Sequence, residues 1–255
     1  MTGSPVALEL RGISHRFGDL LAVERVDLCV APGELVALIG PSGCGKSTLF
    51  DIVAGLAQPD AGEVRFDGRP VADRLGASAY MPQRDALLPW RRVDANVGLP
   101  LELQGRRRAE ARRVARPLLE RFGLADFAGY WPWQLSGGMR HRVAFLRTVI
   151  SRPGLVLLDE PFGDLDGLTR ADLQEWLGDL LVELGPTVAL VTHDVAEAVF
   201  LADRVVVLTP RPARVAAEIP VGLPRPRPAA SREAPEVVAL ERQVREALHE
   251  AAWVP

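Results

Sequence analysis

The chain has 255 residues, of which 48% are hydrophobic and 25% are charged, and its formal net charge is −3. This is the composition of an ordinary globular protein that can bury a sizeable core, in one large domain or one domain with an inserted subdomain. The slightly acidic balance creates no basic field that would favour nucleic acid as a partner. No uncharged apolar stretch approaches the roughly 20 residues that span a bilayer, so work at a membrane would require separate membrane-spanning chains.

The cysteines and the N-terminus both agree with a reducing compartment. Only Cys29 and Cys44 occur, which is no disulfide framework and suits a reducing cytosol. Residues 1–11 include the acidic Glu9 and no apolar core, so we do not expect a signal peptide there.

The first predicted elements are short strands. Residues 13–30 and 63–67 contain short, alternating, turn-rich pieces, which predict an antiparallel edge sheet. Residues 35–39 (LVALI) form a continuous apolar run, which is typical of a strand covered on both faces. Residues 46–54 then predict a helix.

Residues 95–130 interrupt this pattern and are predicted to be helical throughout, within an inserted helical subdomain of about 93–150. The arginines at 106–116 are mixed with Glu110 and alanines, which indicates a solvated helix face rather than a nucleic-acid surface.

Strands and helices alternate after this insertion. Buried strands are expected at 155–158, 188–191 and 205–208, with helices at 168–184 and 195–202 between them. Such alternation implies a mostly parallel sheet with helices on both faces. Prolines and arginines crowd residues 210–228, which excludes a helix there, and a final helix is expected at 233–252. We therefore divide the chain into an α/β domain over 1–228 and a helical tail over 229–255.

The run GPSGCGKS, from Gly40 to Ser47, fits the pattern G-x-x-x-x-G-K-[ST] between a predicted strand and a predicted helix. Glycines let backbone N–H groups point at phosphates, and the helix N-terminus adds its positive dipole end. Lys46 would reach the β- and γ-phosphates, and the Ser47 hydroxyl would bind Mg²⁺. An ordinary glycine turn is the alternative, but the strand–loop–helix context favours a site that binds and hydrolyses ATP.

A second motif, LVLLDE, places two carboxylates at the end of a buried strand. Asp159 would hold the Mg²⁺ shell, and Glu160 would act as a base toward a water molecule. Alone, such a pair is more often a solvated strand end. The phosphate loop on the same predicted sheet favours the functional interpretation.

A third motif joins Ser136, Gly137 and Gly138 at the start of a predicted helix. A serine and two glycines at a helix N-terminus suit an anion, although S-G-G alone is more often a linker or a helix cap.

Taken in order, the motifs resemble those of the nucleotide-binding subunit of ATP-binding cassette (ABC) importers, over residues 6–214. The order is phosphate loop, glutamine loop, LSGG signature, LDE strand, D-loop and switch histidine. The resemblance implies a P-loop NTPase fold of the ABC type. Its mostly parallel core sheet would carry an antiparallel β edge subdomain and an inserted helical subdomain.

The resemblance assigns roles to further residues of the same chain. Phe17 matches the aromatic that stacks on adenine, and Gln83 matches the glutamine that touches Mg²⁺ and senses the γ-phosphate. His193 matches the switch histidine and would act with Glu160 and Lys46 in hydrolysis. The set that would contact the nucleotide in the phosphate loop comprises Gly40, Ser42, Gly43, Cys44, Gly45, Lys46, Ser47 and Thr48. The Mg²⁺ set comprises Ser47, Gln83 and Asp159.

Other family residues act on the second subunit of a homodimer. Ser136, Gly137 and Gly138 would bind the γ-phosphate of ATP held by the other copy, and Asp166 of the D-loop would cross the interface. Three positions depart from the usual pattern, and their roles stay unassigned: Met139, His141 and Asp164.

The segment 84–90 (RDALLPW) resembles the L-L-P-W stretch of the nitrate, sulfonate and taurine importer branch, which also contains importers of pyrimidine thiamine precursors. The implied function is an ATPase that powers import of such a small polar solute. The implied partners are a second copy, separate permease subunits and an extracytoplasmic solute-binding protein, at the cytoplasmic face of the membrane and without nucleic acid. A non-transport ABC ATPase is the main alternative. A P-loop kinase or GTPase and an inactive regulatory cassette are opposed by the signature and by the intact acidic pair.

Overall fold

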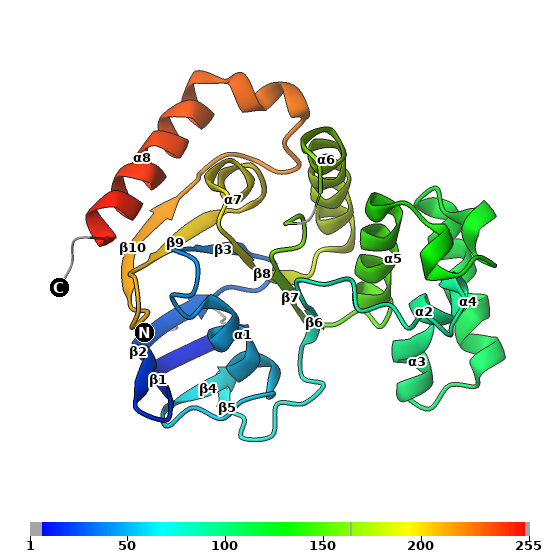
Figure 1. Cartoon of the computed structure of the whole chain (residues 1–255), viewed down its shortest axis with the longest axis horizontal. Coiled ribbons are helices and arrows are strands. Elements are labelled where there is room, and N and C mark those ends of the chain that lie inside the picture. The colour runs from blue at the N-terminus through cyan, green and yellow to red at the C-terminus, as the bar shows by residue number, and fades with distance from the viewer. Residues whose placement is uncertain (1–6, 164, 253–255) are drawn as a thin grey trace.

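The computed structural model describes residues 7–163 and 165–252, which form two sheets with helices around them (Figure 1). The larger sheet has the strand order β10-β9-β3-β8-β7-β6. Its strands are β3 (Leu35–Ile39), β6 (Ala79–Met81), β7 (Leu155–Asp159), β8 (Thr187–Thr192), β9 (Arg204–Leu208) and β10 (Val215–Pro220). All neighbouring pairs are parallel except β9 with β10. The predicted mostly parallel sheet is confirmed.

The smaller sheet is antiparallel and has the order β2-β1-β4-β5. Its strands are β1 (Leu8–Phe17), β2 (Leu20–Val30), β4 (Ala61–Phe66) and β5 (Arg69–Pro70). The predicted antiparallel edge sheet is therefore confirmed, and β1 begins earlier than the alternating pattern indicated.

The apolar strands of the larger sheet separate two hydrophobic cores. In β3, Leu35, Ala37 and Ile39 belong to one core, and Val36 and Leu38 belong to the other. Both faces are buried because helices α5 (Gly137–Val149), α6 (Gly167–Leu184) and α7 (Val195–Leu201) cover one side, while α1 (Lys46–Ala54) and the smaller sheet cover the other. Two covered faces explain why this strand is a continuous apolar run rather than an alternating one.

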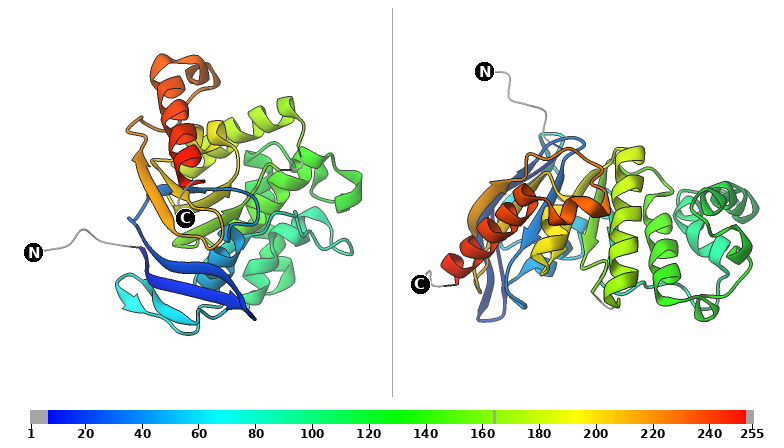
Figure 2. Two further views of the ribbon diagram at one scale, coloured as in Figure 1. Left: turned by 60° about the vertical axis from the view of Figure 1, so that its left-hand side comes forward. Right: turned by 90° about the horizontal axis from the view of Figure 1, so that it is seen from above.

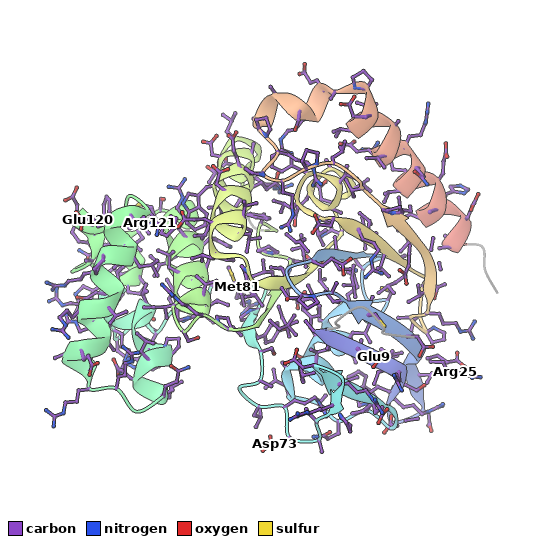
Figure 3. All side chains as sticks on the ribbon, turned by 180° about the vertical axis from the view of Figure 1, so that it is seen from behind. Glu9, Arg25, Asp73, Met81, Glu120 and Arg121 are labelled. Atoms are coloured by element: carbon purple, nitrogen blue, oxygen red, sulfur yellow. The ribbon has the colours of Figure 1, made fainter. Side chains whose placement is uncertain are left out.

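A helical portion made of α2 (Val93–Val97), α3 (Leu99–Leu103) and α4 (Arg108–Arg121) lies beyond α5, on the far side from the smaller sheet (Figures 1 and 2). Met81, which is 1% exposed, ends β6 and lies between the sheet and α5 (Figure 3). The prediction that residues 95–130 are helical throughout is wrong. The chain turns after α3, where Gly105 has φ +92°, and makes only a short 3-10 turn after α4. The proposed subdomain boundaries remain a prediction.

The C-terminal helix α8 (Pro235–Ala251) packs on the core, beside α7, β9 and β10 (Figure 2). Val237, Val244 and Ala251 belong to the same hydrophobic core as β3. Before α8, Arg227 is 5% exposed and donates hydrogen bonds to carbonyls at the C-terminal end of α7. The division of the chain at residue 228 stays a prediction, but the segment after it is packed rather than detached.

Candidate nucleotide site

The phosphate loop runs from the end of β3 to the start of α1 and depends on its glycines. Gly43 has φ +73° and Gly45 has φ +129°, a region that side chains disfavour. A Cβ on Gly45 would lie 2.8 Å from the carbonyl oxygen of Ala22 in β2. The smaller sheet therefore approaches the loop so closely that only glycine fits at position 45.

Lys46 is 5% exposed and curls back over the loop. Its Nζ donates hydrogen bonds to the carbonyl oxygens of Gly40 at 2.8 Å and Pro41 at 3.0 Å. Carbonyl oxygens satisfy the ammonium group without neutralising it, so its full charge is available to a phosphate. Cys44 is buried beneath the loop, and burial raises the pKa of its thiol, which keeps it uncharged.

The carboxylate of Asp159, at the end of β7, is 4% exposed and only partly satisfied. The Tyr80 hydroxyl donates to Oδ2 at 3.2 Å, whereas Oδ1 is buried without a hydrogen-bond partner among the described residues. Burial raises the pKa of Asp159 above its ordinary value, and the contact with the Ser47 hydroxyl offsets part of that rise. A buried carboxylate oxygen that lacks a partner, beside a hydroxyl, fits Mg²⁺, which prefers oxygen ligands.

Glu160 follows Asp159 with a strained backbone, at φ +44°. Its N–H donates to the carbonyl oxygen of Val191 in β8 at 2.8 Å, and this bond helps to hold the unusual conformation. Glu160 Oε2 lies 3.3 Å from Nε2 of Gln83 and 3.3 Å from Nδ1 of His193. Gln83 and His193 thus both contact the same carboxylate oxygen of Glu160, and the motifs predicted all three residues.

An open cleft of about 490 Å³ lies between the two sheets. Asp159 and His193 do not line it but contact two residues that do, Ser47 and Glu160, and Gly40 and Cys44 are not among its lining residues either. The predicted residues that line it are Phe17, Ser42, Gly43, Gly45, Lys46, Ser47, Thr48, Gln83 and Glu160. Phe17 is 56% exposed and packs edge-on against His15, so its ring is accessible for stacking. Leu20, Ala22 and Arg211 also line the cleft, and no motif predicted them.

The signature serine and the D-loop aspartate do not line this cleft but cap two neighbouring helices. Ser136 Oγ accepts a hydrogen bond from the N–H of Met139 at the start of α5, and Asp166 Oδ1 accepts one from the N–H of Thr169 at the start of α6. The hydrogen bond from Thr169 lowers the pKa of Asp166.

The starts of these two helices pack tightly against each other. A Cβ on Gly138 would lie 2.8 Å from Cγ2 of Thr169, and one on Gly137 would lie 3.6 Å from Leu165. The structure therefore brings the predicted residues together in two groups, one in the cleft and one at the joined starts of α5 and α6.

The unusual signature positions have structural contacts of their own. His141 is 7% exposed, with Nδ1 3.0 Å from the carbonyl oxygen of Gly137, and Met139 packs against the main core. Asp164 lies outside the described residues. Across the described ranges 7–163 and 165–252, no helix is long and apolar enough to cross a membrane.

A glycine-rich loop between a central parallel strand and a helix, with an acidic pair on a nearby strand, defines a P-loop nucleoside triphosphatase. Residues 23–163 match the family model described as ABC transporter. The chain belongs to the ABC transporter family, as an ATP-binding cassette that hydrolyses ATP.

Curated relatives support the narrower resemblance to one importer branch. The chain is 46% identical, over 94% of its length and 83% of the relative, to the aliphatic sulfonates import ATP-binding protein SsuB 2 of Pseudomonas aeruginosa (strain UCBPP-PA14). It is also 46% identical, over 76% of its length and 74% of the relative, to the taurine import ATP-binding protein TauB of Chromobacterium violaceum. The predicted resemblance to the nitrate, sulfonate and taurine branch is confirmed.

A solved structure supports the fold and the dimeric state of related cassettes. The dimeric structure of the bacterial ABC transporter cassette MJ0796 superposes with a TM-score of 0.72 at 32% identity, covering 84% of this chain and 98% of that one. A second structure of that cassette, in a post-hydrolysis state bound to ADP and Pi, gives a TM-score of 0.73 at 31% identity. The predicted ABC cassette fold is confirmed.

Proposed function

We propose that the chain powers an importer of a small polar solute such as an aliphatic sulfonate, taurine or nitrate. The observation that carries this proposal is the placement of Lys46 and Glu160 in one cleft, with Asp159 against Ser47 of the same cleft, in a chain whose relatives are import ATP-binding proteins. A pyrimidine vitamin precursor, which the sequence also suggested, remains a prediction. The solute is chosen by the other subunits of the importer rather than by this cleft.

In the proposed reaction Lys46 and the N–H groups of the phosphate loop neutralise the charge that develops on the γ-phosphate. Glu160 orients the attacking water and accepts its proton through Oε2, while His193 and Gln83 hold that carboxylate in place. Ser47 and Asp159 would hold Mg²⁺, with Gln83 at its edge, and the ion would supply further positive charge to the phosphates. Phe17 would stack on the adenine ring, and Thr48 would add a polar contact to the phosphates.

One chain holds only half of the proposed site. Ser136, Gly137, Gly138 and Asp166 gather at the starts of α5 and α6, outside the cleft, so they serve a nucleotide only if they face a second copy. A head-to-tail homodimer closes both clefts at once, because a two-fold axis pairs each cleft with the other chain's signature. The dimeric state of the related cassette supports this arrangement.

The segment 84–90 is the proposed contact with a membrane-spanning permease. Trp90 is 70% exposed there, which marks it as an anchor for a partner. The backbone of the same segment is tied to α5, because Arg147 donates hydrogen bonds to the carbonyl oxygens of Asp85 at 2.8 Å and Ala86 at 2.7 Å. Arg140 adds an ion pair with Asp85 at 3.1 Å. A permease that moves this segment therefore moves the helix that begins at the signature.

The same arrangement implies the remaining partners and the location. A separate permease would hold the chain at the cytoplasmic face of the membrane as a peripheral subunit, and an extracytoplasmic solute-binding protein would deliver the solute. No basic field favours nucleic acid. A non-transport ABC ATPase is the alternative, and it predicts no stable contact between this chain and a permease.

Co-purification with a co-expressed permease subunit of a sulfonate or taurine importer tests the proposal. We expect the wild-type chain to co-purify with the permease and to hydrolyse ATP, and Lys46→Ala to co-purify without hydrolysis. Trp90→Ala should lose most co-purification while keeping the ATPase activity of the isolated chain. Leu75→Ala is the matched control, because Leu75 is 66% exposed but lies outside the segment. Co-purification that Trp90→Ala leaves intact would rule out this docking segment, and none with wild type would favour the non-transport alternative.

A further inference from the structure

Arg211 is a cation at the rim of the nucleotide cleft, in the turn that joins β9 to β10. Its Nε and Nη2 donate hydrogen bonds to the carbonyl oxygen of Gly43 at 3.1 Å and 2.8 Å. We propose that Arg211 positions the phosphate loop for the triphosphate, by holding the peptide between Gly43 and Cys44 with its C=O turned out toward Arg211 and its N–H turned into the loop. This inference rests on the proposed ATP site.

The turn that carries Arg211 is fixed to the body of the protein. Thr209 is 7% exposed, and its hydroxyl donates a hydrogen bond to the carbonyl oxygen of Pro212 at 2.9 Å. The N–H of Ala213 donates to the carbonyl oxygen of Ala22 at 2.9 Å, which ties the turn to β2. Ala22 itself lines the cleft, so the turn and the cleft wall are one unit. Arg211 therefore extends from an anchored turn, although its own side chain is exposed.

The contact between Arg211 and the Gly43 carbonyl fixes the direction of the next N–H group, because the peptide is planar. In a trans peptide the C=O and N–H bonds point in opposite directions. Since the Gly43 carbonyl points at Arg211, the N–H of Cys44 points back into the loop, where the Pro41 carbonyl oxygen accepts it at 3.2 Å. Pro41 also accepts from Lys46, so this N–H and the Lys46 ammonium converge on one acceptor position. Both donors are therefore already directed to one place in the loop, and a phosphate oxygen bound there would draw them away from the Pro41 carbonyl.

Glycine makes this orientation costly to keep without a restraint. Gly43 has φ +73° and no Cβ, so its peptide can rotate more freely than any other residue allows. The two hydrogen bonds from Arg211 remove that freedom before the nucleotide arrives. Pre-organisation of this kind improves binding, because the ordering cost is already met in the free protein.

The charge of Arg211 is also left available to an anion. Among the residues that the structure describes, no carboxylate forms an ion pair with Arg211, whereas Arg214 in the same turn pairs with Glu24 at 2.7 Å. An unpaired guanidinium beside Lys46 adds to the positive potential of the cleft, which attracts the triphosphate. Arg214 thus provides a control with the same residue type in the same turn.

Steady-state ATP hydrolysis by the full chain distinguishes the role of Arg211 from that of Arg214. Losing hydrogen bonds from a charged donor should raise the KM for ATP roughly tenfold in Arg211→Met, with kcat changed less than about twofold, because bound triphosphate orders the loop itself. Arg211→Lys keeps the charge and one donor and should raise KM about threefold. Arg214→Met should match wild type. Binding of a fluorescent ATP analogue should weaken in the same order.

Several outcomes would overturn the inference. A KM in Arg211→Met equal to that of Arg214→Met removes the proposed role, and so does a fall in kcat with unchanged KM. If Arg211→Met does not fold, as circular dichroism would show, an unchanged KM in Arg211→Lys has the same meaning. Absence of ATP binding in the wild-type chain would instead refute the proposed function, so the two failures are distinguishable.

Discussion

Glu160 Oε2 lies 3.3 Å from Nδ1 of His193, and β7 and β8, the strands that deliver these residues, are neighbours in the central sheet. Asp159 pairs in register with Val191, so the residues that follow the two strands emerge at the same edge. The Glu160 carboxylate reaches the histidine from a backbone held at φ +44°. The sheet itself thus sets the distance between the proposed base and the residue that orients it.

Glu160→Gln should abolish most hydrolysis while leaving nucleotide binding intact. The amide cannot accept a proton from water, and loss of a general base costs roughly a hundredfold to ten-thousandfold in kcat. Because ATP stays bound between two copies, the variant should shift from monomer to dimer with ATP on size-exclusion chromatography. Glu24→Gln, at the surface ion pair with Arg214, is the matched control and should behave like wild type. A Glu160→Gln chain that remains monomeric with ATP would count against the composite site.

A mixture of two inactive variants should regain activity if each site is shared between copies. Lys46→Ala removes the phosphate-loop cation, and Ser136→Arg blocks the signature at an exposed helix cap, which costs about 1 kcal/mol of stability. In a mixed dimer one site carries both defects and the other carries neither. Random pairing at equal amounts makes half the dimers mixed, so about a quarter of the wild-type sites should be intact. The measurement is ATPase activity of the mixture against each variant alone, and a mixture no more active than its components argues that each chain works alone.

Periodicity predicted the central sheet because both of its faces are buried. The run LVALI of β3 needs no partner to be recognised, since every residue in it contacts one core or the other. The same reasoning missed β6, which has three residues and only one, Met81, that is fully buried. It also missed β10, an edge strand inside a proline-rich stretch where only Ile219 is buried. Short or half-exposed strands carry too little pattern to be distinguished from loops.

The sequence predicts the residues of the cleft that belong to local motifs and misses those that do not. Lys46, Ser47 and Glu160 belong to local patterns whose chemistry fixes their spacing. Arg211 contacts Gly43 across 168 residues of sequence, and no local pattern contains a pairing of that kind. The prediction of one helical stretch over 95–130 was wrong because a local pattern was followed too far. Helical periodicity continues past Gly98 and Gly105, whereas the helices of the structure end there. Glycine in a periodic stretch should have lowered the predicted helix length.

Arg227→Met should destabilise the fold without touching the cleft. Its Nη1 donates to the carbonyl oxygens of Val199, Phe200 and Ala202, at 3.1, 2.8 and 2.9 Å. These are carbonyls at the end of α7 that have no partner within the helix, so removing the guanidinium leaves them buried and unsatisfied. We expect a loss of about 2–4 kcal/mol in the free energy of unfolding, measured with urea. Arg245→Met, at a surface pair with Glu241 on α8, should cost less than about 0.5 kcal/mol, and equal effects would refute the capping role.

Glu197, in the helix that follows the switch histidine, should make stability depend on pH. Burial, and then the charge of Asp194, raise the pKa of Glu197 to about 8. Gln174 donates to its Oε2 at 3.4 Å, while Oε1 is buried without a hydrogen-bond partner in the described ranges. The folded chain therefore binds this proton more tightly than the unfolded chain does. The stabilisation is present below the unfolded pKa and is lost as pH rises from about 4.5 to about 8.

Glu197→Gln isolates this proton from the rest of the titration. The amide resembles the protonated acid in shape and stays neutral, so the variant should gain stability relative to wild type as pH rises through that window. Urea unfolding at about pH 5, 6.5 and 8 measures the difference, which should be smallest at the lowest pH and largest at the highest. Glu246→Gln on the exposed face of α8 is the control, and its difference from wild type should not change with pH. A Glu197→Gln difference that is constant across the three pH values would mean that Glu197 keeps its charge when folded, with Arg170 and Thr192 compensating the burial that raises its pKa.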